Sequence, residues 1–131
     1  MKIIRKGEHF KKKANQDWFH GIVWQELIMD CLNPARVKIL KVSFEPSSRT
    51  AWHTHPLGQT LHVIEGAGLI AYRGSKPVPI KLGDTVWIPP GKEHWHGASI
   101  DSRLVHFAIQ EALSGSTANW LEQVTETDYS L

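Results

Sequence analysis

The chain has 131 residues, a formal net charge of +2 and one cysteine, Cys31. This length suffices for one domain with its own core, so we expect residues 1–131 to fold as a single unit. With 41% hydrophobic and 21% charged residues, the composition excludes a disordered or fibrous chain. A single cysteine also excludes an intrachain disulfide and a thiolate metal cluster.

Neither nucleic acid nor a membrane is an expected partner of this chain. The one basic run, Lys11–Lys13, is too short to form the broad basic face that nucleic-acid binding needs, and we expect it to lie in a solvated loop. No apolar run approaches the roughly 20 residues that span a bilayer. The first residues lack the apolar core of a signal peptide, which predicts a cytoplasmic location.

Short strand-like segments follow one another along most of the chain. They are rich in β-branched and apolar residues and are separated by Gly, Pro, Asp and Ser. Strands at this spacing predict an all-β sandwich or barrel, because no segment has the helical pattern that a parallel α/β sheet needs. In the C-terminal tail, 112–131, residues 118–124 are more helix-like. The predicted strands are 21–24, 37–44, 59–65, 68–72, 77–82, 85–88 and a last core strand at about 102–111.

Five of the eight histidines lie in a pattern suited to metal binding. Two pairs have the spacing His-x-His, and residues two apart on an extended strand point to the same face. Imidazoles that converge from different strands can ligate one divalent ion. One such pair is weak evidence, but two pairs and a histidine on a third strand together indicate a metal site in the barrel interior. The histidines are His53 and His55, His94 and His96, and His106.

Two stretches within residues 47–98 resemble the two motifs of the cupin family. The resemblance implies a conical antiparallel β-barrel, also called a jelly roll or double-stranded β-helix. It also implies one divalent metal ion per chain in the mouth of that barrel. The matching positions are His53, His55, Gln59 and Gly66 in the first motif, and Gly83, Pro89, Gly91 and His94 in the second.

Longer stretches resemble the small bacterial cupin hydroxynitrile lyases, which use manganese to cleave or form cyanohydrins. The similar stretches are 50–61, 91–98 and 106–111, with a thinner likeness in the tail. The resemblance implies Mn(II) as the cofactor, although imidazole and amide donors also accept iron, nickel, copper and zinc. The ligands that the resemblance implies are His53, His55, Gln59 and His94.

The same resemblance implies that His96 and His106 lie near the open coordination positions. A neutral histidine can take or give a proton near neutral pH, so we expect His96 to be the catalytic acid or base. His106 is the alternative candidate for this role. Leu40, Val42 and Gln110 are candidates to line the substrate pocket. His106 and Gln110 fit equally well as groups that orient a ligand or a water.

Gln59 stands where the cupin family has a glutamate ligand. Without a carboxylate, nothing stabilises the trivalent state of a bound iron or manganese, so the site favours Lewis-acid chemistry over redox cycling. Together with the resemblance to the cupin hydroxynitrile lyases, this predicts a lyase that uses a divalent metal on a cyanohydrin or related small carbonyl compound. Two alternatives stay open, because one fold carries many activities: a metal-dependent oxygenase, and a non-enzymatic module that binds a metal and a sugar or other small ligand.

A homodimer is the expected assembly. Cupins of this size commonly pair, and an N-terminal strand at residues 2–5 could extend and protect the sheet edge of a partner. Light scattering should therefore give twice the mass of the chain. A monomeric mass would contradict the expectation.

Overall fold

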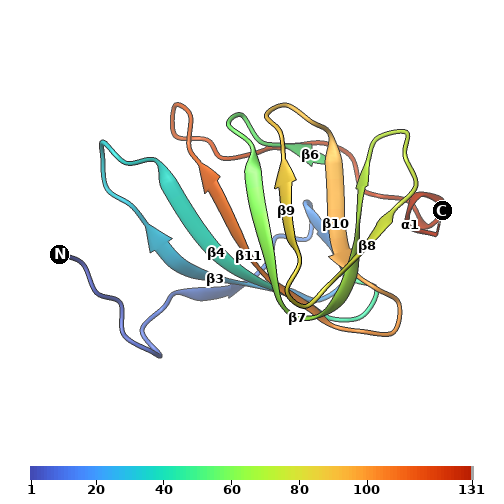
Figure 1. The fold of residues 1–131 in the computed structure, drawn as a ribbon, viewed down its shortest axis with the longest axis horizontal. Coiled ribbons are helices and arrows are strands. Elements are labelled where there is room, and N and C mark those ends of the chain that lie inside the picture. The colour runs from blue at the N-terminus through green and yellow to red at the C-terminus, as the bar shows by residue number, and fades with distance from the viewer. Residues whose placement is uncertain (131) are drawn as a thin grey trace.

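The computed structural model describes residues 1–130, and the last residue of the predicted tail lies outside this range. Within it, twelve strands form one curled antiparallel sheet, followed by a single short helix (Figure 1). This confirms the predicted all-β fold with a short C-terminal helix. The strands are β1 (Lys11–Lys13), β2 (Phe19–His20), β3 (Val23–Asp30), β4 (Val37–Phe44), β5 (Arg49–Thr50), β6 (His53–Thr54), β7 (Gln59–Tyr72), β8 (Val78–Lys81), β9 (Thr85–Ile88), β10 (His94–Ala98), β11 (Leu104–Glu111) and β12 (Asn119–Trp120), and the helix is α1 (Glu126–Tyr129).

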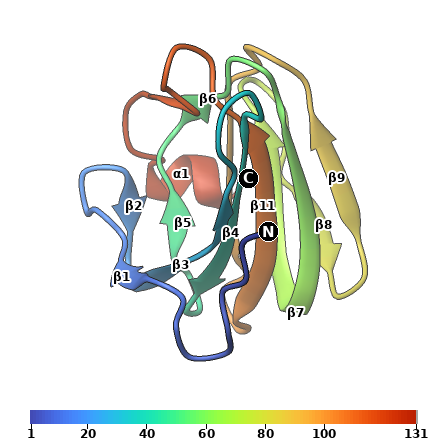
Figure 2. The same ribbon diagram turned by 90° about the vertical axis from the view of Figure 1, so that its left-hand side faces the viewer.

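The sheet follows the order β1-β3-β4-β11-β7-β10-β5-β2, with β6, β8, β9 and β12 paired off this path. It curls so that β2 and β5 face β7 and β9 across the interior (Figure 2). Side chains alternate between the two faces of each strand, so every second residue points into the space that the curl encloses. This geometry brings residues from distant parts of the sequence to one cavity.

The long strand β7 turns the corner between the two halves of the sheet at Gly66. Its first half pairs with β11 and β9, and its second half pairs with β10 and β8. Gly66 has φ of 75°, and a Cβ there would lie 1.9 Å from the carbonyl oxygen of Arg103. Only glycine tolerates this approach. The predicted strands 59–65 and 68–72 are therefore one bent strand.

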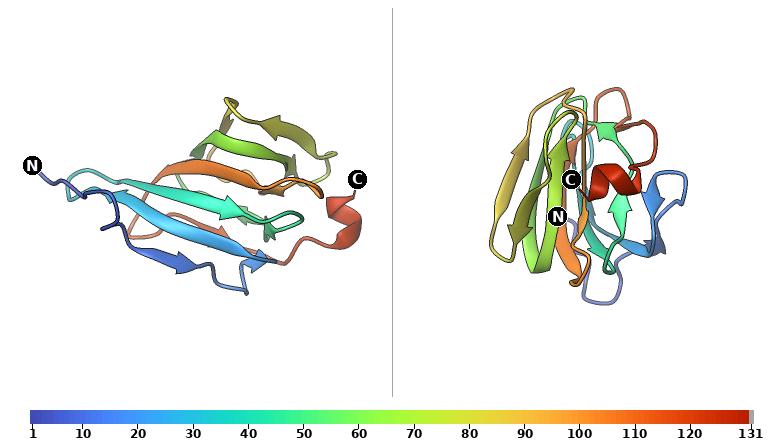
Figure 3. Two further views of the ribbon diagram at one scale, coloured as in Figure 1. Left: turned by 90° about the horizontal axis from the view of Figure 1, so that it is seen from below. Right: turned by 90° about the vertical axis from the view of Figure 1, so that its right-hand side faces the viewer.

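The main core fills the inner side of the barrel, and Phe19, Val42 and Ala108 belong both to this core and to the lining of the cavity. The fully buried members of the core come from β3, β4, β7, β9, β10 and β11. A second cluster packs Trp52 and Trp95 against Tyr129 of α1, whose hydroxyl donates to the carbonyl oxygen of Ala98 at 2.6 Å. The helix lies at the end of the molecule opposite the N-terminus (Figure 3).

Two sequence predictions were wrong. Lys11–Lys13 is not a loop but the edge strand β1, which pairs with β3. Residues 118–124 are not helical: Asn119–Trp120 forms β12 on β6, and the helix begins only after Thr125, whose side chain caps it. In both places tertiary pairing overrides weak local preference.

No helix among residues 1–130 is long and apolar enough to cross a membrane. Residues 2–5 form no strand within the described chain, so their pairing with a second copy stays a prediction.

Candidate metal centre

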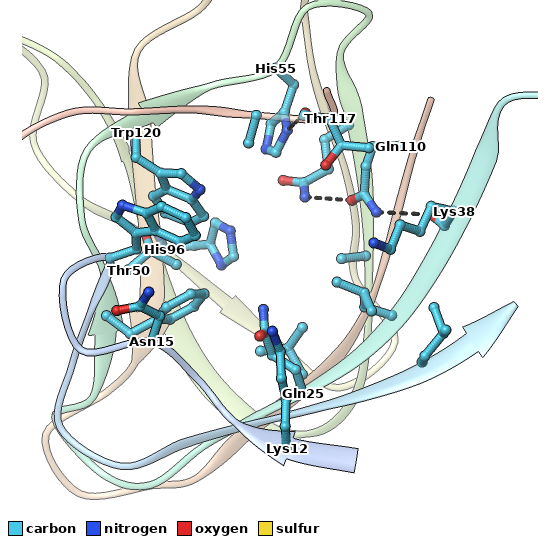
Figure 4. A pocket seen from close by; sticks show the side chains of 18 of the residues that line it. Lys12, Asn15, Gln25, Lys38, Thr50, His55, His96, Gln110, Thr117 and Trp120 are labelled. Carbon is cyan, nitrogen blue, oxygen red and sulfur yellow. Dashed lines mark hydrogen bonds between the residues drawn. The ribbon is translucent and has the colours of Figure 1, made fainter. Parts of the chain in front are cut away.

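The interior of the barrel holds a cavity of about 460 Å³. One wall is aromatic and another is aliphatic, while imidazole and amide groups project from β6–β7, β10 and β11 (Figure 4). This volume lies in the usual range for small-molecule sites. The lining residues are Phe10, Lys12, Asn15, Trp18, Phe19, Gln25, Leu27, Lys38, Leu40, Val42, Thr50, His55, Gln59, His96, Ala108, Gln110, Thr117, Ala118 and Trp120.

Three buried histidines form a group that can hold a metal ion. Ring nitrogens of His53, His94 and His96 all lie within 4.8 Å of one another. The register of the sheet explains the grouping, because His94 of β10 is the direct partner of His53 on β6. His96 lies two residues further along β10 and therefore projects from the same face as His94.

His55 lies beside this group. Its ring centroid is 4.9 Å from that of His53 and 5.3 Å from that of His94. Gln59 follows at the start of β7. The ligands implied by the resemblance thus differ from the three-histidine group in containing His55 and Gln59 in place of His96.

Backbone carbonyls fix the tautomer of three of these imidazoles. A carbonyl oxygen only accepts hydrogen bonds, so the Nδ1 that faces it must carry the proton. The lone pair of the ring is then on Nε2, where a metal ion can bind it. The Nδ1 partners are the carbonyl oxygens of Ala51 for His53 at 2.9 Å, of Thr117 for His55 at 2.7 Å, and of Lys92 for His94 at 2.9 Å.

Several buried polar atoms have no partner within the described residues. They include Nε2 of His55, Nε2 of His94 and Oε1 of Gln59. Leaving such acceptors buried and unpaired costs free energy, whereas a cation at this place would satisfy all three. The residues present therefore fit a divalent ion.

A chain of amides sets the direction of Gln59. Its Nε2 donates to Oε1 of Gln110 at 2.9 Å, and Nε2 of Gln110 donates to the backbone carbonyl of Lys38 at 2.8 Å. Since that carbonyl can only accept, both amides have one allowed orientation, and Gln59 turns its oxygen away from Gln110. The oxygen is thereby free to act as a ligand.

Burial keeps the clustered histidines neutral. Desolvation is the main cause of a lowered pKa at each of them, and it brings the pKa of His94 and of His106 to about 4. The pKa values of His53 and His96 lie well below the usual one, and that of His55 is lowered as well. Neutral imidazoles are the form that binds metals and accepts protons.

His96 and His106 form a buried pair. Nε2 of His106 lies 3.1 Å from Nδ1 of His96, and Phe44 packs against both rings. His96 lines the cavity, whereas His106 does not. A proton on His96 can therefore be exchanged with the cavity on one side and stabilised by His106 on the other.

Leu40, Val42 and Gln110 line the cavity, as the sequence suggested. Sequence reasoning missed several other lining residues, above all Trp120, which stacks on His53 and on Trp18. Its neighbourhood had been expected to be helical, and only the pairing of β12 with β6 turns this side chain inward.

Acid is expected to destabilise the metal-free protein. The unfolded chain protonates its histidines near about pH 6.5, whereas His94 and His106 in the folded chain protonate at about 4. Between these values the unfolded state binds more protons, so the free energy of unfolding falls as pH falls. Each of the two histidines contributes at most about 1.4 kcal/mol per pH unit to this slope. Urea titrations of chelated protein from about pH 7 to about pH 4 check this, and a stability independent of pH would contradict it.

Comparison with known proteins places this site in a family. The model of the cupin domain matches residues 40–109. The chain is 45% identical over 129 residues to a protein named (R)-mandelonitrile lyase from Granulicella tundricola, covering 98% of each chain.

Solved structures agree. A cupin-like protein of Thermotoga maritima superposes with a TM-score of 0.84 at 42% identity, covering 89% of each chain. The polyketide cyclase RemF of Streptomyces resistomycificus has a TM-score of 0.76 at 14% identity over 99% of this chain and 91% of its own, which indicates a shared fold alone. The barrel, the two histidine motifs and these matches lead to one conclusion: the chain belongs to the cupin family.

Proposed function

We propose that this protein is a metal-dependent lyase that cleaves and forms cyanohydrins or related small carbonyl adducts. The observation that carries the proposal is the set of buried, unpartnered donor atoms on His55, Gln59 and His94, because His55 and Gln59 line the same cavity as His96. The similarity to a mandelonitrile lyase at 45% identity supports the same class of reaction.

Four side chains would hold the ion: His53, His55, Gln59 and His94. Carbonyl partners leave the Nε2 lone pair available on each of the three imidazoles, and the amide chain does the same for Oε1 of Gln59. His96 differs in its partner, because its Nδ1 lies 3.1 Å from Nε2 of another imidazole, His106, so no carbonyl fixes which nitrogen carries the proton. This division supports His96 as a proton carrier rather than a ligand.

The four donors are all neutral, so the full charge of a divalent ion stays uncompensated. This favours a divalent Lewis acid over a centre that must reach a trivalent state. Such donors accept several divalent ions, and the resemblance to the manganese-dependent cupin hydroxynitrile lyases makes Mn(II) our proposed cofactor. When bound, such an ion stabilises negative charge on a substrate oxygen.

His96 would carry the proton in both directions. In cleavage, His96 accepts the proton of the cyanohydrin hydroxyl. The bond between the hydroxyl-bearing carbon and the nitrile carbon then breaks, its electron pair leaves with cyanide, and the hydroxyl-bearing carbon becomes a carbonyl carbon. The proton on His96 then passes to the departing cyanide and gives hydrogen cyanide. Burial holds the pKa of His96 below its usual value, so the ring is neutral and in the form that accepts a proton, and Nε2 of His106 lies within hydrogen-bond distance of it.

Metal analysis of the purified protein, combined with a mandelonitrile cleavage assay, tests the proposal. We expect cleavage with manganese, loss of cleavage after chelation, and recovery when manganese is returned. Bound metal without cleavage would reject the lyase. Oxygen consumption with a diketone or catechol would then favour an oxygenase, and ligand binding without turnover would favour a binding module.

Removal of the Gln110 side-chain amide should weaken metal binding although Gln110 is not itself a proposed ligand. In Gln110→Leu, Gln59 loses the partner that turns its oxygen toward the site, so we expect the affinity for Mn(II) to fall about 10- to 100-fold. Gln25→Leu is the matched control, since Gln25 also lines the cavity. Calorimetric titration with Mn(II) measures the metal affinity of both variants. Equal affinities in the two variants would contradict the role of Gln110 in positioning Gln59.

A further inference from the structure

Two lysines line the cavity together with the proposed metal ligands. Lys12 projects from β1 and Lys38 from β4, and both side chains turn toward the cavity interior (Figure 4). Among the residues 1–130 that the structure describes, the cavity lining contains no aspartate and no glutamate. The cavity therefore has two cationic side chains without an acidic one to balance them.

Neither lysine is engaged elsewhere in the described part of the chain. The ion pairs in this part of the chain involve His9, Arg49, Arg73 and Arg103. The lysines that lie over aromatic rings are Lys11 and Lys92. Lys11, the neighbour of Lys12, lies over the ring of Trp24 at 5.6 Å, on the other side of the strand. Lys12 and Lys38 are thus the cations left for a ligand.

The proposed metal site adds to this positive field. All its donors are neutral, so the charge of a bound divalent ion is added to that of the two ammonium groups. Low-dielectric walls concentrate such a field and draw anions into a cleft. An acidic ligand would balance the positive charge of this cavity.

Part of the cavity wall is apolar. Trp18, Phe19 and Trp120 line one side, and Leu40 and Val42 line another. An aromatic or aliphatic body fits this part of the 460 Å³ cavity.

We propose that the lysines bind a carboxylate, so that the substrate is an oxo acid, or its cyanohydrin, in which an apolar body separates the carboxylate from the reacting carbon. A carboxylate supplies the anionic oxygens to which ammonium groups donate charge-assisted hydrogen bonds. The inference rests on the proposed lyase function only for the reacting end of the ligand. The carboxylate end requires no metal.

Binding to the metal-free protein isolates the role of the lysines. The probes are 3-phenylpropionate and its neutral amide, 3-phenylpropionamide, titrated by calorimetry into chelated and into manganese-loaded protein. We expect the carboxylate to bind about tenfold more tightly than the amide in both forms, with an advantage that shrinks as salt is added. Equal affinities for the two probes in the chelated protein would overturn the proposal.

Single variants assign the effect to particular residues. Lys12→Gln and Lys38→Gln should each weaken binding of the carboxylate about two- to fivefold and leave binding of the amide unchanged, because one partly exposed ion pair contributes little. The carbonyl of Lys38 that holds Gln110 is part of the backbone and survives the substitution. The matched controls are Lys13→Gln and Lys41→Gln. Lys13 is one residue from Lys12 and Lys41 is three residues from Lys38, and neither side chain lines the cavity. Equal losses in controls and variants would mean a general charge effect and would overturn the proposal.

Turnover separates this inference from the proposed function. The substrates are the cyanohydrins of 4-formylbenzoate and of 4-formylbenzamide, and a higher kcat/KM for the first is expected. Cleavage of both at equal kcat/KM would leave the lyase in place and overturn the carboxylate site. Tighter binding of 3-phenylpropionate to chelated protein without cleavage of any cyanohydrin would support the carboxylate site and reject the lyase.

Discussion

His53→Ala is expected to lose the metal ion and, with it, cleavage of mandelonitrile. The side chain is buried, and the carbonyl of Ala51 fixes its Nδ1, so its Nε2 lone pair is the one available to a metal ion. We expect less than about one hundredth of the wild-type metal affinity, since a ligand contributes at least as much as the groups that orient it. Elemental analysis after gel filtration measures the bound metal.

His62→Ala is the control for this experiment. His62 lies on β7 near the proposed ligand Gln59, but its ring bonds to the side chain of Thr85 outside the cavity. This variant should keep its metal and its activity. Full metal content in His53→Ala would reject the proposed site.

His96→Ala is expected to keep its metal and lose catalysis. A positioned acid or base contributes about 10²- to 10⁴-fold to the rate, so kcat should fall by that factor. His55→Ala, by contrast, should lose the metal. The two variants together decide between the proposed ligands and the three-histidine group, because His96 belongs only to the latter.

Elemental analysis and single-turnover rates on both variants provide the measurement. Loss of metal in His96→Ala with retention in His55→Ala would reverse the assignment. Removal of the buried partner in His106→Ala should lower the rate less than His96→Ala does, since His106 does not reach the cavity. Thermal melts of each variant check that the barrel remains folded.

Local sequence determined most of the strands. Strands β4 and β9 begin and end where the predicted segments do, because alternating apolar residues and adjacent turn residues define short strands strongly. The His-x-His spacing was equally informative, since the alternation of a strand alone places both imidazoles of a pair on one face. These features were sufficient to predict an all-β fold and a cluster of histidines.

Only the tertiary structure decided how the donors are oriented. His55 bonds to the carbonyl of Thr117, 62 residues away, and Gln59 bonds to Gln110, 51 residues away. Gln110 in turn bonds to the carbonyl of Lys38, 72 residues away. Such contacts depend on the register in which β11 lies between β4 and β7, which no local pattern encodes.

The same reason explains what the sequence missed at the cavity. Trp120 and Lys12 lie in segments with weak local preference, and they line the cavity because β12 pairs with β6 and β1 pairs with β3. Residue types and spacing thus determined which chemistry this chain can carry. Long-range pairing of strands decided which atoms face the cavity, because the direction of a side chain depends on a register set by partners far away in the sequence.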